Sequence, residues 1–173
     1  VYDDMCLEAG VTVLYHTTLV EAMCSKDKIQ CCIIQTMQGL MAIRAKTFID
    51  ATGDGDLMYL AGCEFRLGRN EDKLCQPMTT CFRVANVTEE WNDSEERAAI
   101  QKLYREFREN GKITNPREDI LYFSGLGKGI VHFNTTRVVK LDPTDPFDVS
   151  KAEMIAREQI FELYAFLKEN SLA

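Results

Sequence analysis

The sequence has little of what a membrane protein or a nucleic-acid-binding protein requires. Its longest apolar runs are short pieces such as residues 31–34, far below the roughly 18 residues of a membrane-spanning helix. The formal net charge is −7, and there is no basic stripe that could neutralise the phosphates of a nucleic acid. The first residues carry acids where a signal peptide carries cations. We therefore expect neither a membrane nor a nucleic acid among the partners.

The cysteines and histidines also lack the spacing of a structural site. The seven cysteines form an odd set with no C-x-x-C pair, and only two histidines accompany them. This pattern disfavours both a disulfide framework and a zinc site. We expect reduced thiols, no bound metal and a cytoplasmic location.

The first third of the chain predicts a small antiparallel sheet. Gly10 ends a short helix, and apolar, β-branched segments follow at residues 11–15 and 18–23, 29–36 and 40–46, separated by polar or glycine-containing turns. Residues 47–52 are mostly apolar or small, which is typical of a strand that is covered on both faces. The pattern of apolar and polar residues changes from about residue 63.

The remainder predicts a mixture of helices and short strands. Strands are expected at residues 74–84, 120–123 and 130–133. A capping box of Asp93 and Glu96 predicts the start of a helix that ends near Gly111, and Ser150 with Glu153 predicts the start of a last helix. That last helix carries a wide apolar surface, so we expect something further to cover it.

Residues 48–56, FIDATGDGD, are the most informative stretch, because an apolar segment ends in two acids separated by glycine. Three roles are open for Asp54 and Asp56. They can cap the short helix expected after them, hold Mg²⁺ together with the phosphates of a nucleotide, or accept hydrogen bonds from the hydroxyl groups of a nucleotide cofactor. Gly53-x-Gly55-x-x-Met58 is an imperfect dinucleotide fingerprint and does not decide between them.

Four runs carry a resemblance to a known family: EAGVTVLYHTTLVEA, KTFIDATGDGDLMYLAG, CQPMTTCFRVANV and NTTRVVKLDPTDPFDVSKAE. Together they resemble the bacterial FAD-dependent oxidoreductases of the glutathione-reductase-like flavoprotein superfamily. The resemblance spans essentially the whole chain and implies FAD as the cofactor. It also implies a role for the residues that match the family's blocks. Those beside the dinucleotide are Thr18, Leu19, Ala51, Thr52, Gly53 and Asp54, and we add Asp56 as a further cofactor-binding candidate.

The resemblance implies an α+β fold in two parts. Residues 1–62 match part of a Rossmann-like FAD-binding domain, namely its β-meander and the last strand, loop and helix. Residues 63–173 resemble the substrate domain that lies over the flavin ring. In that domain Arg137 is expected to bind a substrate carboxylate and His132 to move a proton, although a lone histidine in a strand is more often structural.

The implied function is electron transfer between a small-molecule substrate and FAD. No G-x-G-x-x-G loop precedes Gly10, so we expect this chain to be an internal fragment, inactive alone, whose partners are the substrate and the remainder of its own polypeptide. Two alternatives stay open: a non-catalytic interaction domain, and a Mg²⁺-dependent phosphate-handling site at Asp54 and Asp56.

Overall fold

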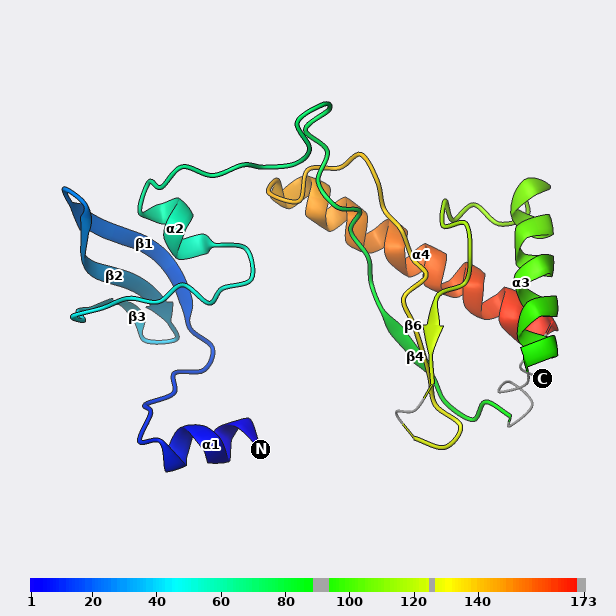
Figure 1. Cartoon of the computed structure of the whole chain (residues 1–173), viewed down its shortest axis with the longest axis horizontal. Helices are drawn as coiled ribbons and strands as arrows, with labels where there is room; N and C mark the ends of the chain where they lie inside the picture. The colour runs from blue at the N-terminus through cyan, green and yellow to red at the C-terminus, as the bar shows by residue number, and fades with distance from the viewer. Residues whose placement is uncertain (89–93, 125–126, 171–173) are drawn as a thin grey trace. The chain divides into compact units, whose positions relative to one another are not determined.

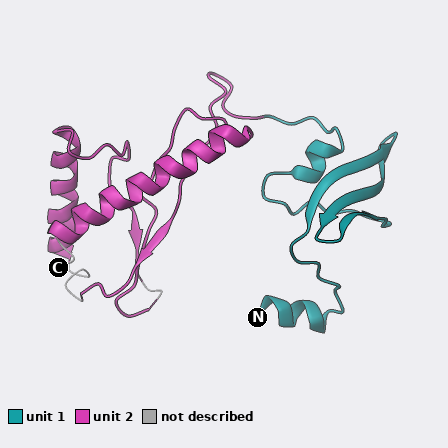
Figure 2. Cartoon of the chain, turned by 180° about the vertical axis from the view of Figure 1, so that it is seen from behind, with its two compact units in different colours: residues 1–66 teal, residues 67–173 magenta. Residues whose placement is uncertain are grey.

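A computed structural model describes residues 1–88, 94–124 and 127–170 (Figure 1). The chain divides into two compact units, residues 1–66 and 67–173 (Figure 2), and each is described by itself. Helices and two small antiparallel sheets alternate along the chain, which confirms the α+β class. The parallel sheet of a Rossmann-like domain stays a prediction. Among the described helices, none has an apolar stretch long enough to cross a bilayer.

Unit 1 opens with the helix α1 (Tyr2–Glu8), which ends as predicted at Gly10. Gly10 has a φ of 69°, and the N–H groups of Gly10 and Val11 donate back to the carbonyls of Leu7 and Cys6, a helix ending that favours glycine. The prediction of a strand at residues 11–15 is wrong. That segment precedes the sheet, whose first paired residue is Thr18, opposite Gln35 near the end of the neighbouring strand.

The antiparallel meander is confirmed. Strands β1 (Thr18–Ser25), β2 (Lys28–Thr36) and β3 (Gly39–Ile43) lie in the order β1-β2-β3 (Figure 1). A short helix, α2 (Asp56–Leu60), covers β1. Ala22, Cys32 and Leu57 form the buried cluster between sheet and helix. This packing places the loop that precedes α2 beside the start of β1.

The strand predicted at residues 47–52 is not formed. The segment pairs with no described strand, and the side chain of Ile49 is 85% exposed. A strand covered on both faces needs neighbours that hydrogen-bond to it, and β3 ends at Ile43, before the segment begins. Phe48 attaches the segment to the unit by packing, partly buried, against the cluster beneath α2.

Unit 2 combines two helices with a second sheet. Strands β4 (Phe82–Val84), β6 (Val131–Phe133) and β5 (Tyr122–Phe123) are antiparallel, in the order β4-β6-β5. The helices are α3 (Ser94–Glu109) and α4 (Pro146–Asn170). The core buries Tyr104, Phe133, Leu163 and Leu167 at 1% exposure or less. The sheet and both helices therefore share one hydrophobic core.

The strand predicted at residues 74–84 is shorter than expected. Only Phe82–Val84 pair in the described sheet, and Met78 makes an isolated bridge to Val138. Pro77, which has no N–H to donate, precedes that bridge. Asp93, the first residue of the predicted capping box, lies outside the described residues, as do Gly125 and Leu126.

The predicted start of the last helix is wrong, because α4 begins one turn before Ser150. Asp145 is the N-cap: its carboxylate accepts the N–H groups of Phe147 and Asp148, both at 2.9 Å. Pro146 follows at the first helical position, where its missing N–H costs nothing. Ser150 lies inside the helix and donates to the carbonyl of Pro146 at 2.7 Å, while Glu153 pairs with Arg157.

Replacing Asp145 by alanine should lower the free energy of unfolding of unit 2 by about 1 kcal/mol, because two N–H groups lose their acceptor. The matched control is Ser150→Ala, which should cost less. Urea denaturation of both variants, followed by far-UV circular dichroism, measures the difference. A larger loss for Ser150→Ala would restore the cap to the position that the sequence predicted.

Candidate functional site

The loop between the meander and α2 is organised by Asp50, which the sequence analysis did not single out. One carboxylate oxygen accepts the N–H of Thr52 at 3.1 Å and its hydroxyl at 2.7 Å, and the other accepts the N–H of Met58 at 3.0 Å. The hydroxyl of Thr52 in turn accepts the N–H of Asp56 at 2.8 Å. Asp50 and Thr52 thus cap α2 from the preceding segment. The D-x-T spacing, typical of a local side-chain turn, is the signal that could have revealed this.

These bonds hold the pKa of Asp50 below its ordinary value. The hydrogen bond from the Thr52 hydroxyl is the largest cause, followed by the backbone N–H groups of Met58 and Thr52. Each of them stabilises the ionised carboxylate. At neutral pH the Asp50 carboxylate is therefore ionised, and it holds the loop through charged hydrogen bonds.

The capping role proposed for Asp54 and Asp56 falls to other residues. Both carboxylates are exposed, and neither has a hydrogen-bond or ion-pair partner in the described part of the chain. Gly53 and Gly55, with φ values of 30° and 76°, turn the backbone around them. A Cβ built on Gly53 would meet nothing within 4 Å. The loop thus presents two free carboxylates and an open backbone face.

The other cofactor-binding candidates belong to the same unit. Thr18 and Leu19 begin β1, and Leu19 packs against the cluster that contains Leu57 of α2. Ala51 and Thr52 lie in the loop that Asp50 fastens. The start of β1 and the helix that follows the loop thus meet in one cluster, although they are more than thirty residues apart in the sequence.

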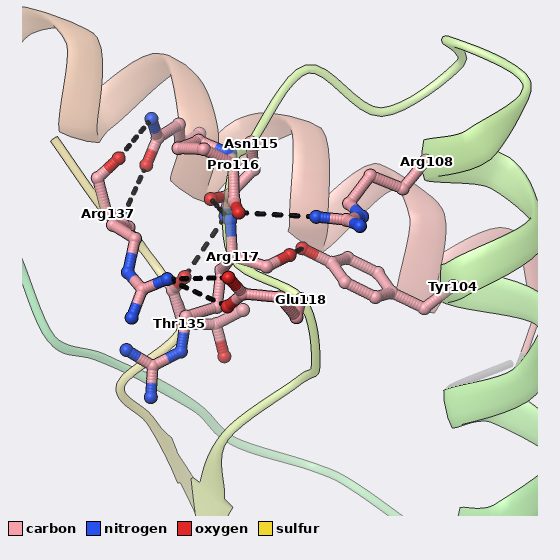
Figure 3. A network of polar contacts seen from close by, with 9 residues as sticks. Tyr104, Arg108, Asn115, Pro116, Arg117, Glu118, Thr135 and Arg137 are labelled. Atoms are coloured by element: carbon pink, nitrogen blue, oxygen red, sulfur yellow. Dashed lines mark hydrogen bonds and ion pairs between the residues drawn. The ribbon is translucent and has the colours of Figure 1, made fainter. Parts of the chain in front are cut away.

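Arg137 in unit 2 is held by its backbone and by its side chain (Figure 3). Its N–H donates to the Gln159 side chain at 2.7 Å, and the amide of Gln159 donates to the Arg137 carbonyl at 3.1 Å. One guanidinium nitrogen donates to both carboxylate oxygens of Glu118, at 3.0 and 2.7 Å. Gln159 is buried on α4 and faces the core from the same side as Ala156 and Leu163, a spacing that could have identified it.

Glu118 is an exposed acid that several positive charges surround. A hydrogen bond from its own backbone N–H is the largest cause that lowers its pKa, and the charges of Arg137, Arg108 and Arg117 act in the same direction. Its side chain is 62% exposed, against 28% for Arg137. The Glu118 carboxylate is thus ionised, and it is exposed enough for another carboxylate to replace it at Arg137.

His132 has different surroundings from Arg137. It lies on β6 opposite Arg83 and Phe123, with its ring 6.1 Å from that of Phe123. Its Nδ1 is buried without a hydrogen-bond partner among the described residues. The described contacts join His132 and Arg137 to separate partners, so a shared catalytic role for them stays a prediction.

Arg137 also lines a pocket of about 670 Å³ in unit 2. One wall is the loop of residues 68–77 and the other is the segment of residues 137–141. Arg69 and Lys140 contribute two further cations to the lining. The sequence analysis missed both, since nothing in the spacing of residues some seventy positions apart indicates that they meet.

Comparison with known families gives one result. A family model described as FAD dependent oxidoreductase matches residues 1–171. The chain belongs to this family. Comparisons with curated proteins and with solved structures gave no match. The resemblance drawn from the sequence is confirmed, and FAD is the cofactor of the family.

The loop of unit 1 fits the hydroxyl-bearing part of FAD better than its pyrophosphate. The N–H groups of Asp56 and Met58 already donate to Thr52 and Asp50, so they are not available to phosphate oxygens. The free carboxylates of Asp54 and Asp56 would repel a phosphate and attract an O–H donor. The open space at Gly53 allows a bound group to approach the backbone.

The structure adds no further ligand, among the residues that it describes, to the metal site considered at Asp54 and Asp56. Within the described ranges, no group of three or more His, Cys, Asp or Glu residues is arranged to hold a metal ion. Mg²⁺ prefers about six oxygen ligands, so water and the phosphates of a nucleotide would have to supply those that the two carboxylates do not.

Asp50→Asn should destabilise unit 1 at pH 7 and lose this effect in acid. Because the folded-state pKa of Asp50 is lowered, its contribution is fully present above its unfolded pKa of about 4 and disappears as the pH falls through the folded value. Urea midpoints of wild type and variant at pH 7 and pH 2.5 measure this. Asp54→Asn is the control and should not change the midpoint at pH 7. An equal Asp50→Asn deficit at both pH values would contradict the role of the charge.

Proposed function

We propose that the chain is the part of a larger flavoenzyme that joins a cofactor-binding unit to a substrate-binding unit, and that the enzyme transfers electrons between a small-molecule substrate and FAD. The family match supports the oxidoreductase class. The observation that carries the proposal is the pair of carboxylates, Asp54 and Asp56, which lack a partner among the described residues on a loop that Asp50 holds in place. The FAD ring system supplies the redox chemistry, while the protein orients both reactants.

In this proposal Asp54 and Asp56 accept hydrogen bonds from hydroxyl groups of the ribose or the ribityl chain. Ala51, Thr52 and Gly53 offer the backbone to the dinucleotide, and Thr18 and Leu19 contact the adenine through backbone groups at the start of β1. A carboxylate that accepts such a bond contributes about 1.5 to 3 kcal/mol. The rigid loop reduces the entropy that binding would otherwise cost.

Residues 63–173 are proposed to bind the substrate. Arg137 presents a guanidinium whose geometry suits a carboxylate, as its contact with Glu118 illustrates (Figure 3). His132 has a buried Nδ1 without a partner among the described residues, and it is proposed to hold or move a proton there. The remainder of its own polypeptide is the proposed macromolecular partner.

One observation favours a second function, that of a non-catalytic interaction domain. Phe147, Met154 and Phe161 are 82%, 59% and 72% exposed, respectively, and they follow one another at seven-residue intervals along α4. Residues seven apart lie on one face of a helix. An apolar row of this kind is typical of protein–protein contact, and such a domain would need no FAD.

Asp54→Ala in the intact flavoprotein should lower the affinity for FAD by at least about tenfold, because a charged hydrogen-bond acceptor is removed. Flavin absorbance per protein after purification, together with titration of the apoprotein with FAD, measures the loss. Asp27→Ala removes an equally exposed acid from the turn between β1 and β2 and should retain FAD. Full flavin content in Asp54→Ala would contradict the proposed contact.

A further inference from the structure

We propose that the pocket between residues 68–77 and residues 137–141 binds a small organic anion that carries carboxylate groups. We call this cavity of about 670 Å³, lined by the two segments, the cationic pocket. That the anion is the substrate rests on the proposed function, whereas the binding itself does not.

The charge of the cationic pocket is opposite to that of the chain. Its described lining residues include Arg69, Arg137 and Lys140 and no acid, while the whole chain has a net charge of −7. A concave surface with cations of one sign focuses its field and raises the local concentration of anions. Arg69 and Arg137 each pair with an acid outside the lining, Asp72 and Glu118 respectively. Lys140 therefore leaves an excess of positive charge that favours a negatively charged ligand.

The three cations differ in their availability. Arg69 is occupied by Asp72, which accepts from its Nε at 3.0 Å. Lys140 has no hydrogen-bond or ion-pair partner in the part of the chain that the structure describes. Arg137 pairs with the exposed Glu118 and keeps a buried Nε without a partner among the described residues. Lys140 and Arg137 are thus the two groups able to bind a ligand.

The contact with Glu118 shows what kind of group Arg137 binds. The Glu118 carboxylate accepts two hydrogen bonds from one guanidinium nitrogen (Figure 3), and its side chain is 62% exposed. A ligand carboxylate that also reaches Lys140 would gain a second charged contact that Glu118 does not supply. The ligand therefore displaces Glu118 from Arg137, and the energetic cost is small because an exposed ion pair contributes at most about 1 kcal/mol.

The rest of the lining suits a carbon skeleton. Leu74, Pro77, Val138, Val139 and Leu141 supply apolar surface, and Gln76 supplies an amide. A pocket of this size, whose lining combines apolar surface with polar groups, is compatible with a small-molecule site. This mixture favours an organic anion over an inorganic one.

The walls of the cationic pocket are joined before any ligand binds. Met78 and Val138 exchange two backbone hydrogen bonds, of 3.0 and 2.8 Å, which join the two segments. The loop of the first wall closes through the N–H of Arg69, which donates to the Leu74 carbonyl at 3.0 Å. Gly68, with a φ of 69°, is required there, because a Cβ would lie 2.1 Å from the Lys73 carbonyl oxygen. A preformed site loses little entropy on binding.

The test is calorimetric titration of the full chain, without FAD, using citrate as the carboxylate probe and inorganic phosphate as the comparison, at constant ionic strength. Wild type should bind citrate more tightly than phosphate. Arg137→Gln and Lys140→Gln should each weaken citrate binding by about tenfold or more. Glu118→Gln should strengthen it severalfold, because it removes the competing carboxylate. Lys151→Gln, which removes an exposed charge on α4 outside the pocket, should bind as wild type does.

Three results would overturn the inference: weakening by Lys151→Gln equal to that by Lys140→Gln, phosphate binding at least as tight as citrate binding, or a Glu118→Gln variant that folds but binds citrate no better than wild type. Far-UV circular dichroism of each variant identifies a folding defect, and Lys140→Gln tests the site through a side chain that makes no hydrogen bond or ion pair in the described part of the chain. Because no flavin is present, loss of FAD binding in the intact enzyme would remove the proposed function without affecting this result.

Discussion

Unit 1 depends on one set of hydrogen bonds, in which the Asp50 carboxylate accepts three donors on the two sides of a glycine turn. The donors are the N–H and hydroxyl of Thr52 and the N–H of Met58. Without them, residues 47–55 would be an extended, exposed segment attached to a helix of only five residues, too short to be stable by itself. With them, the turn is joined to α2, and in the described part of the chain the carboxylates of Asp54 and Asp56 take no part in the capping network.

In unit 2, side chains also satisfy and position backbone segments. Side chains of α4 supply the hydrogen bonds that the small sheet does not. Glu162 accepts the N–H groups of Thr114 and Asn115 at 2.6 and 3.1 Å, and Gln159 satisfies both backbone groups of Arg137. Buried backbone groups must be paired, so one long helix determines where two irregular segments lie. Arg137 is positioned by this pairing and not by a strand.

The sequence was sufficient wherever a local rule decides the structure. Gly10 and Gly62 end helices as glycine in the left-handed region does, and the turns of the meander follow their polar and glycine residues. It failed where an element depends on distant partners. Residues 47–52 have the composition of a buried strand, but composition does not supply neighbours. The start of α4 was misplaced because two caps competed, and Asp145 with Pro146 satisfies the first N–H groups one turn earlier.

The candidate site shows the same limit. The acids and glycines of the FIDATGDGD stretch could be singled out because they are adjacent, whereas Arg69, Arg137 and Lys140 are brought to one cavity only by folding. The two sets suit different chemical groups: the carboxylates of unit 1 suit hydroxyl donors, and the cations of unit 2 suit carboxylates. The carboxylates of unit 1 would repel phosphate groups and the cations of unit 2 would attract anions, so the two sets favour different ligand groups. Neither preference could be read from the net charge of −7 alone, because the net charge does not show where each charged side chain lies.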